Sequence, residues 1–306
     1  MHGPGAGIQK MGEHLVTFAY AKINLTLEIL GKREDDYHEI RSVIQTIDLA
    51  DILTFSPSEE LELRFDDPAL EKLDSPRVLI TRAVELLWEK MGERRGVRIF
   101  HRKGIPKFSG LGSSAADAAA VLRALNKMWN LDLSQEELCE LAARISSDAP
   151  FFIYGGTALL EGRGERVRPL PPLPERWLVI LNPPLKIRSG KTARAYSKIL
   201  PSHYTGGEIT QKLVKEIESG KLEEPPLFNV FEQVIYELYP ELSFYRDLLL
   251  RAGARSVHLA GAGPALFSFV KSREEGEEMI RRLEGGKGEL FLVRTVNARS
   301  SNGGHK

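Results

Sequence analysis

A run of small residues at positions 110–120, GLGSSAADAAA, most constrains what this chain can fold into. A predicted strand, GVRIFH, precedes it, and the apolar residues after it recur at helical spacing. Gly110 and Gly112 permit positive φ and let a ligand approach the backbone, while a helix start leaves its first N–H groups unpaired. Such a place suits a phosphate, but Ser114 and Asp117 also fit a capping box with close helix packing. On its own, the run leaves both interpretations open.

The same loop excludes two common nucleotide-binding patterns. No lysine follows Gly112, as the pattern G-x-x-x-x-G-K-[ST] requires, and the third glycine of G-x-G-x-x-G is missing. We therefore do not expect a dinucleotide-binding domain.

Hydrophobic periodicity elsewhere predicts mixed strands and helices, and hence an α+β fold in both halves of the chain. The segment AKINLTLEIL alternates cleanly, which predicts a half-buried strand with Lys22 and Asn24 on its polar face. The segment APFFIYGGTALLEGRGERV is predicted to form three short strands joined by turns. Helices are expected at 78–90, at 114–129, after the Ser134–Glu137 capping box, and twice in the last third of the chain.

Four prolines in the segment RPLPPLPER mark the expected domain boundary. We expect an N-terminal domain over residues 15–170 and a C-terminal domain over residues 171–298. Tails of small and polar residues, 1–14 and 299–306, are expected to flank the two domains.

The charge balance excludes several classes of protein. Among 306 residues, 42 basic and 42 acidic side chains cancel, so no net field favours nucleic acid or an anionic membrane. No apolar run reaches the roughly 18 residues that a membrane span needs. The single cysteine, Cys139, excludes an internal disulfide and is typical of a reducing compartment. The start lacks a secretory signal, so we expect a cytoplasmic protein, either a monomer or a homodimer.

The longer string IPKFSGLGSSAA resembles the P-x-x-x-G-L-G-S-S-A-A signature of the GHMP kinases, the superfamily of galactokinase, homoserine kinase and mevalonate kinase. In that superfamily the loop wraps the phosphates of ATP, so the resemblance implies ATP and Mg²⁺ as cofactors. It also implies a two-domain fold, with an N-terminal ribosomal-S5-like α/β domain and a C-terminal ferredoxin-like α+β domain. The matching loop residues are Pro106, Lys107, Phe108, Ser109, Gly110, Leu111, Gly112, Ser113, Ser114, Ala115 and Ala116.

Two further segments resemble the family of 4-diphosphocytidyl-2-C-methyl-D-erythritol kinases, and the resemblance covers most of residues 19–270. The first begins at AKINL and includes the DDYHE turn, and the second is SSDAPFFIYGGTALLEGRGE. The resemblance implies ATP-dependent phosphorylation of the 2-hydroxyl of that cytidine diphosphate substrate, in the non-mevalonate route to isoprenoids. Lys22 and Asp148 match the catalytic pair. Asp148 would accept the hydroxyl proton as general base, and Lys22 would hold that base and stabilise the developing charge.

The same resemblance implies the residues that bind the substrate. Tyr37 and His38 match positions that line the cytidine site, where a ring can stack on the base and an imidazole can hydrogen-bond its edge. A glycine loop in the segment AGAG offers backbone amides to the diphosphate. The residues expected to contact the substrate are Asn24, Tyr37, His38, Thr192, Gly261 and Gly263.

Three departures from the family pattern bear on the substrate more than on the reaction. The family usually has a run of glycines before its Ser-Ser pair, whereas this chain has the general superfamily order, Ser113–Ser114 followed by Ala-Ala-Asp, which leaves open the serine that reaches the metal. Alanines replace both serines of a usual S-G-S-G loop, and valine follows Asn229 where aspartate is usual. The alternatives are another small-molecule GHMP kinase, of homoserine or mevalonate type, and a catalytically silent member that binds a nucleotide.

Overall fold

The structure, a computed structural model, describes residues 8–67, 74–187, 190–222, 224–283 and 285–298. The described strands form one sheet of eight strands and a second sheet of four. Two long antiparallel strands, β2 (His14–Lys32) and β3 (His38–Pro57), run through the whole first sheet. Its other strands are β1 (Gln9–Met11), β4 (Leu61–Phe65), β5 (Val97–Arg102), β6 (Thr157–Gly162), β7 (Arg166–Pro169) and β9 (Phe228–Asn229).

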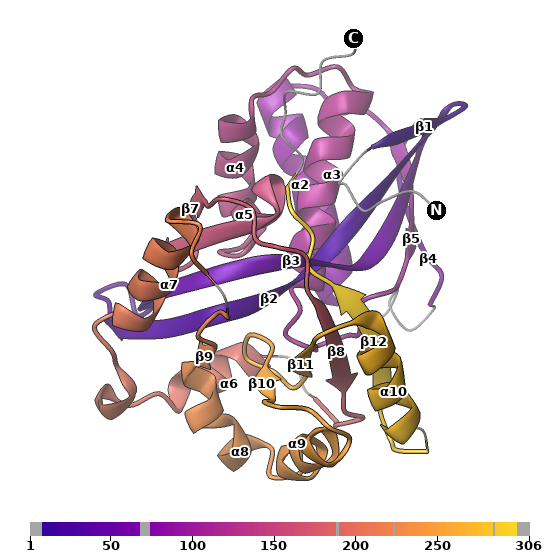
Figure 1. Cartoon of the computed structure of the whole chain (residues 1–306). Helices are drawn as coiled ribbons and strands as arrows, with labels where there is room; N and C mark the ends of the chain where they lie inside the picture. The colour runs from indigo at the N-terminus through magenta and orange to yellow at the C-terminus, as the bar shows by residue number, and fades with distance from the viewer. Residues whose placement is uncertain (1–7, 68–73, 188–189, 223, 284, 299–306) are drawn as a thin grey trace.

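Helices from the first half of the chain gather over one end of this sheet (Figure 1). They are α2 (Asp74–Met91), α3 (Ser113–Met128), α4 (Gln135–Ala143) and α5 (Ala149–Tyr154). The alanines at the start of α3 are buried, and their small side chains let this helix pack closely against α2 and β2. The alanine run therefore serves the core, while the helix N-terminus faces the glycine loop that precedes it.

The second sheet is antiparallel and has the strand order β10-β11-β8-β12. Its strands are β8 (Trp177–Asn182), β10 (His258–Leu259), β11 (Leu266–Val270) and β12 (Glu289–Arg294). Around it lie the helices α6 (Lys191–Ser197), α7 (Glu208–Glu218), α8 (Ile235–Leu238), α9 (Leu242–Arg251) and α10 (Arg273–Leu283), with 3-10 turns at Pro201–His203 and Val230–Gln233.

The C-terminal half also completes the first sheet. Strand β9 pairs with β2 in parallel, and helix α7 packs on β2 and β3. A further bridge joins Ile47 to Thr295. Segments from beyond residue 170 thus contribute to the packing of the N-terminal sheet. The domain boundary near residue 170 stays a prediction.

The expectation of a half-buried first strand was wrong, because β2 is buried on both faces at its centre. Lys22 and Asn24 are each 4% exposed, and Thr26 is fully buried. Helix α7 covers this polar face, where the Thr210 hydroxyl donates to the Thr26 hydroxyl at 2.9 Å and the Thr210 N–H donates to Glu28 Oε2 at 2.7 Å. The alternation of apolar and polar residues in β2 therefore distinguishes an apolar buried face from a polar buried face, and not a buried face from an exposed one.

The expectation of a strand at APFFIY was also wrong, because these residues form helix α5. Pro150 lies in the first turn, where proline is tolerated, and Gly155 ends the helix with φ of 67°. A run of six apolar residues cannot be assigned to strand or helix by periodicity alone. The strands that follow at β6 and β7, and the Ser134–Glu137 capping box at the start of α4, are as expected.

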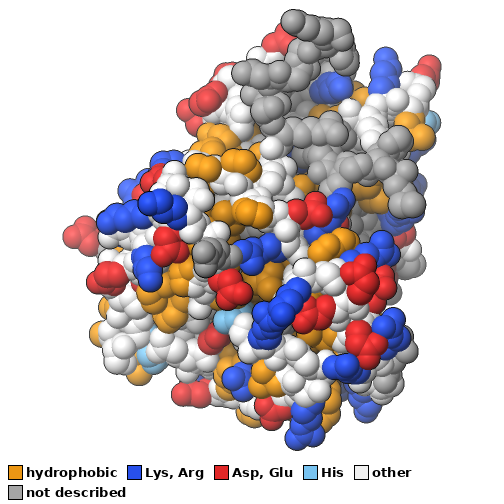
Figure 2. Space-filling view, in the orientation of Figure 1, with side chains coloured by type: hydrophobic (Ala, Val, Ile, Leu, Met, Phe, Trp, Pro, Cys, Tyr) orange, Lys and Arg blue, Asp and Glu red, His pale blue; other side chains and the backbone are white. Residues whose placement is uncertain are grey.

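On the face shown in Figure 2, positive and negative side chains are interspersed, in keeping with the balanced composition. Among the described helices, none is long and apolar enough to cross a bilayer.

Candidate active site

Lys22 lies at the centre of β2, with its side chain enclosed between the two halves of the chain. Its backbone N–H donates to the carbonyl of Leu111 at 3.0 Å, which ties the strand to the glycine loop. Its ammonium group donates to Asn24 Oδ1 at 2.8 Å, and Asn24 in turn donates to the Ser42 hydroxyl at 2.9 Å. Burial lowers the pKa of Lys22, and the negative charge of Asp148 opposes that shift. The structure thus brings the two predicted catalytic residues within electrostatic reach of each other.

Asp148 immediately precedes helix α5, at its N-cap position. Its carboxylate accepts no hydrogen bond from the first turn of α5, all of which the structure describes, so it is not used as a helix cap. The side chain is half-buried, and a Cβ placed on Gly164 would lie 3.6 Å from its Oδ1. An uncapped carboxylate beside a buried lysine can accept a proton.

The loop before α3 has the backbone that its sequence predicts. Phe108, Gly110 and Gly112 have φ of 55°, 90° and 83°, and Gly112 is the N-cap of α3. No side chain caps this helix start. The first-turn N–H groups and the positive end of the helix dipole are therefore available to an anion.

Ser113, the first residue of α3, belongs to a buried ionic group behind the loop. Its hydroxyl donates to Asp51 Oδ2 at 2.8 Å and accepts from the Lys103 ammonium group, which also contacts Asp51 Oδ2 at 2.5 Å. The other oxygen of Asp51 accepts the N–H groups of Gly104 and Ile105, at 2.7 Å and 2.8 Å. These bonds hold both ends of the loop against β3. The Ser113 hydroxyl already donates one hydrogen bond and accepts another within this group.

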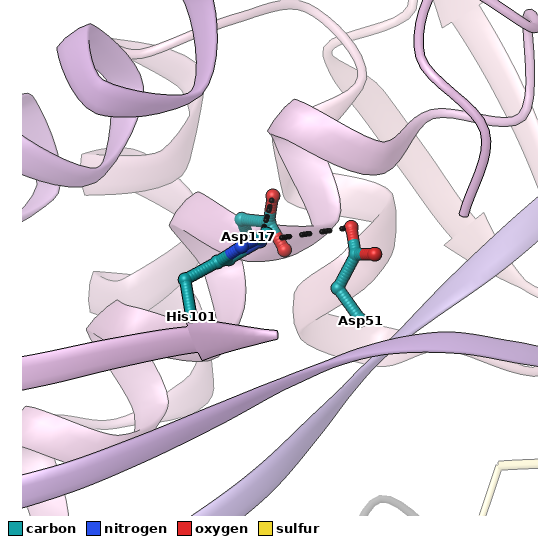
Figure 3. A group of neighbouring side chains, drawn as sticks. All are labelled: Asp51, His101 and Asp117. Atoms are coloured by element: carbon teal, nitrogen blue, oxygen red, sulfur yellow. Dashed lines mark hydrogen bonds and ion pairs between the residues drawn. The ribbon is translucent and has the colours of Figure 1, made fainter. Parts of the chain in front are cut away.

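Asp51 also belongs to a second buried group with His101 and Asp117 (Figure 3). His101 Nε2 lies 3.1 Å from Asp117 Oδ2 and 3.8 Å from Asp51 Oδ2. Burial and the nearby charge of Asp51 raise the pKa of Asp117. Burial opposes charge on His101, yet its hydrogen bond to Asp117 and the charge of that residue raise its pKa on balance.

These three side chains offer ligand atoms within 4.8 Å of one another, but they do not suit Mg²⁺. Mg²⁺ prefers octahedral oxygen ligands and usually keeps several waters, whereas this group is fully buried and includes an imidazole. The ammonium group of Lys103 already neutralises Asp51. The group is better explained as internal support for the loop and for the first turns of α3.

A second glycine loop, residues 260–264, packs directly against the first. The N–H of Ala265 donates to the Ser109 carbonyl at 3.0 Å. A Cβ on Gly110 would lie 2.0 Å from the Ala260 carbonyl oxygen, and a Cβ on Gly261 would lie 3.1 Å from the Lys22 ammonium nitrogen. Only glycine fits either position, so the two predicted loops and Lys22 form one continuous site.

Tyr37 and His38 lie at the turn between β2 and β3. The His38 ring stacks on Tyr196 with centroids 5.1 Å apart, and burial lowers the pKa of His38. Tyr37 is 52% exposed, and the guanidinium of Arg163 lies 4.7 Å above its ring. Arg163 precedes the glycine that approaches Asp148, so this turn connects the predicted base-binding residues to the predicted general base.

Sequence reasoning missed Lys191, which begins α6. Its ammonium group donates to the Gly263 carbonyl, and burial together with the charge of Lys22 lowers its pKa to about 7. Thr192, the predicted substrate contact, is exposed beside it. Nothing in the segment SGKTARAY distinguishes this lysine from a surface residue.

Asn229 holds the second glycine loop, a role that the sequence did not indicate. Its side-chain amide donates to the carbonyls of Leu259 and Gly261 at 2.9 Å and 2.7 Å.

Comparison with known proteins agrees with this geometry. Residues 78–156 match the GHMP kinases N terminal domain, and residues 213–288 match the GHMP kinases C terminal family. Proteins named 4-diphosphocytidyl-2-C-methyl-D-erythritol kinase share 44% identity over 282 residues in Dehalococcoides mccartyi and 40% over 287 residues in Carboxydothermus hydrogenoformans. These alignments cover 92% and 93% of this chain, and 98% of each relative.

Solved structures agree as well. A crystal structure of 4-(cytidine 5'-diphospho)-2C-methyl-D-erythritol kinase superposes with a TM-score of 0.77 at 31% identity, covering 92% of this chain and all of that one. Homoserine kinase from Cytophaga hutchinsonii superposes with a TM-score of 0.71 at 20% identity, covering 96% of this chain and 98% of that one, which shows a shared fold. The two-domain GHMP kinase fold expected from the sequence is thereby confirmed. The chain belongs to the 4-diphosphocytidyl-2-C-methyl-D-erythritol kinase family of GHMP kinases.

Proposed function

We propose that this chain transfers the γ-phosphate of ATP to the 2-hydroxyl of 4-diphosphocytidyl-2-C-methyl-D-erythritol. The observation that carries the proposal is the meeting of Lys22 and the uncapped Asp148 between the phosphate loop and the Tyr37–His38 turn. The names of its relatives specify the acceptor. The phosphate loop supports ATP as donor, because its helix N-terminus is free of side-chain caps.

In this mechanism Asp148 accepts the proton of the attacking hydroxyl. Lys22 stabilises the negative charge that develops on the transferred group, and its hydrogen bond to Asn24 fixes the position of the ammonium group. Burial of Lys22 strengthens its stabilisation of that charge, because electrostatic interactions are stronger away from bulk water.

The diphosphate of the acceptor binds at the second glycine loop in this proposal. Gly261 and Gly263 bring the backbone close, and the ammonium group of Lys191 lies on the carbonyl of Gly263. The cytosine stacks on the exposed ring of Tyr37, and His38 lies beside it in the same turn.

Oxygen ligands for Mg²⁺ are present at the mouth of the loop. Ser113 and Ser114 both bring hydroxyl groups to this place, so a metal ion here would be held by hydroxyl oxygens of the loop, and the carboxylate of Asp148 keeps its role as base. Hydroxyl and carboxylate oxygens suit Mg²⁺. When bound, the ion neutralises charge on the ATP phosphates.

The test is phosphate transfer from ATP to the cytidine diphosphate substrate, followed by phosphorus NMR. Asp148→Asn should lower kcat by about 10²–10⁴, the usual contribution of general base catalysis. Asp132→Asn, at an exposed position, is the matched control and should keep full activity. Normal turnover of the Asp148→Asn variant would exclude the base role. Transfer to homoserine or mevalonate, with none to the cytidine substrate, would exclude the proposed acceptor.

A further inference from the structure

A cavity of about 330 Å³ lies among α3, α4 and α5, beside the chain that follows β12. Its volume lies within the range of small-molecule sites. Apart from Ala116, no described residue of the candidate active site lines it. Its walls are mainly apolar, with a few polar groups among them. The residues that line it include Thr46, Arg123, Leu138, Phe152, Ile153 and Val296.

Arg123 brings a positive charge to this cavity without a balancing negative one. Its Nη1 donates to the carbonyl of Phe152, and its Nε is buried without a hydrogen bond to any described residue. No carboxylate in the described part of the chain acts on the charge of this guanidinium. Burial alone lowers the pKa of the guanidinium, to about 10. The side chain is partly buried, and a buried guanidinium nitrogen with no carboxylate beside it favours an anion.

Thr46 supplies a second unused polar group. Its side chain is 5% exposed, and its hydroxyl oxygen has no hydrogen-bond partner among the described residues. Its backbone is fully engaged, since its N–H donates to Gly156 and its carbonyl accepts from Val296. Buried hydroxyls are nearly always hydrogen-bonded, so this one is available to a ligand.

Phe152 separates the cavity from the candidate active site. A Cβ on Gly112 would lie 2.5 Å from the Phe152 ring and 3.2 Å from Lys22 Cγ, so the ring packs against the loop on its other side. Phe152 belongs to α5, which has Asp148 at its N-cap. An occupant of the cavity would therefore contact α5 without entering the space beside Lys22.

We propose that this cavity binds a small amphiphilic anion, with its head group on Arg123 and Thr46 and a short apolar chain against Leu138, Ile153 and Val296. The unpaired guanidinium selects an anionic head, and the apolar walls select a chain of a few carbons. A carboxylate and a phosphate monoester share this chemistry.

The test is isothermal titration of the full chain with hexanoate and with hexyl phosphate. At least one of the two probes should bind at one saturable site and raise the melting temperature of the protein. Hexan-1-ol lacks the charge and inorganic phosphate lacks the chain, so each should bind at least about tenfold more weakly. Adenosine 5'-diphosphate should not displace the probe, because the phosphate loop lies beyond Phe152.

Two variants locate the site. Arg123→Gln keeps a donor for the Phe152 carbonyl but removes the charge, and should weaken binding at least about tenfold. Thr46→Val keeps the shape and removes only the hydroxyl, and should weaken it a few-fold. Circular dichroism checks that each variant is folded. The proposal is overturned if neither probe saturates the wild-type chain, if both variants bind as the wild type does, or if adenosine 5'-diphosphate displaces the probe.

Discussion

Replacing Lys191 by methionine tests whether its buried ammonium group binds the diphosphate of the substrate. In the free protein, burial and the charge of Lys22 lower the pKa of Lys191 from its ordinary 10.5 to about 7. A bound diphosphate would place negative charge beside the group and raise that pKa. The substrate diphosphate is a diester, so its own charge does not change through the neutral range.

The size of the effect follows from this pKa. Below pH 7, Lys191 is protonated in both the free and the bound protein, and affinity is independent of its titration. Above pH 7, binding must take up a proton, so the dissociation constant rises by up to about tenfold per pH unit. At pH 8.5 the dissociation constant is therefore about 30-fold above its low-pH limit, a difference of about 2 kcal/mol.

The assay is calorimetric titration with the cytidine substrate, without ATP, from pH 6.5 to 8.5 in buffers of different ionisation enthalpy. The wild type should take up close to one proton at pH 8, and Lys191→Met should take up none and show a flat profile. Lys198→Met, at the exposed residue that directly follows the same helix, is the matched control and should behave as the wild type. An unchanged pH slope in Lys191→Met would refute the assignment.

The lowered pKa also fixes the sign of a stability effect. The unfolded chain keeps the Lys191 proton up to pH 10.5, while the folded chain loses it near pH 7. Between these values the unfolded state binds more protons, so this residue makes the free energy of unfolding rise with pH, by up to about 1.4 kcal/mol per unit. Urea unfolding of Lys191→Met should lack this rise.

Three further substitutions test the geometry of the site. Gly110→Ala adds a Cβ 2.0 Å from the Ala260 carbonyl oxygen at a residue of positive φ, and should lower the free energy of unfolding by more than about 2 kcal/mol. Its control is Gly92→Ala, also at positive φ but in open space, which should lower the free energy of unfolding by about 1 kcal/mol. Ser113→Ala removes the hydroxyl that donates to Asp51, and should lower the free energy of unfolding by about 1 kcal/mol. Tyr37→Ala should raise the KM for the cytidine substrate by about 5- to 150-fold, equivalent to about 1–3 kcal/mol of stacking, and leave that for ATP unchanged. Equal losses of stability in Gly110→Ala and Gly92→Ala, unchanged stability in Ser113→Ala, or a shifted KM for ATP in Tyr37→Ala would contradict the placement.

The sequence allowed prediction of the elements with long, clear periodicity. The helices at 78–90 and 114–129 agree with α2 and α3 to within a few residues at most ends. The short helix α5 could not be recognised, because its apolar run has no period long enough to measure. Aspartate before it, proline in its first turn and glycine after it were the local signals that favoured a helix.

The support of the loop could not have been predicted, because it depends on strand pairing. Asp51 and Ser113 are 62 residues apart, and Asp51 and Lys103 are 52 apart, yet the pairing of β3 with β5 brings them together. Each looks like an ordinary surface residue in the sequence. Lys191 escaped notice for the same reason, since only the packing of α6 against the second glycine loop buries it.

The two halves of the chain therefore make one site rather than two adjoining ones. The Ala260 carbonyl lies where a side chain on Gly110 would be, so the shape of each glycine loop depends on the other. Asn229, from the C-terminal half, holds the second loop by two carbonyls while its own strand pairs with β2, the strand that carries Lys22. A shift between the halves would displace the acceptor loop and the donor loop together with Lys22. Phosphate transfer requires donor and acceptor oxygens in line, and this shared packing fixes their relative position before either substrate binds.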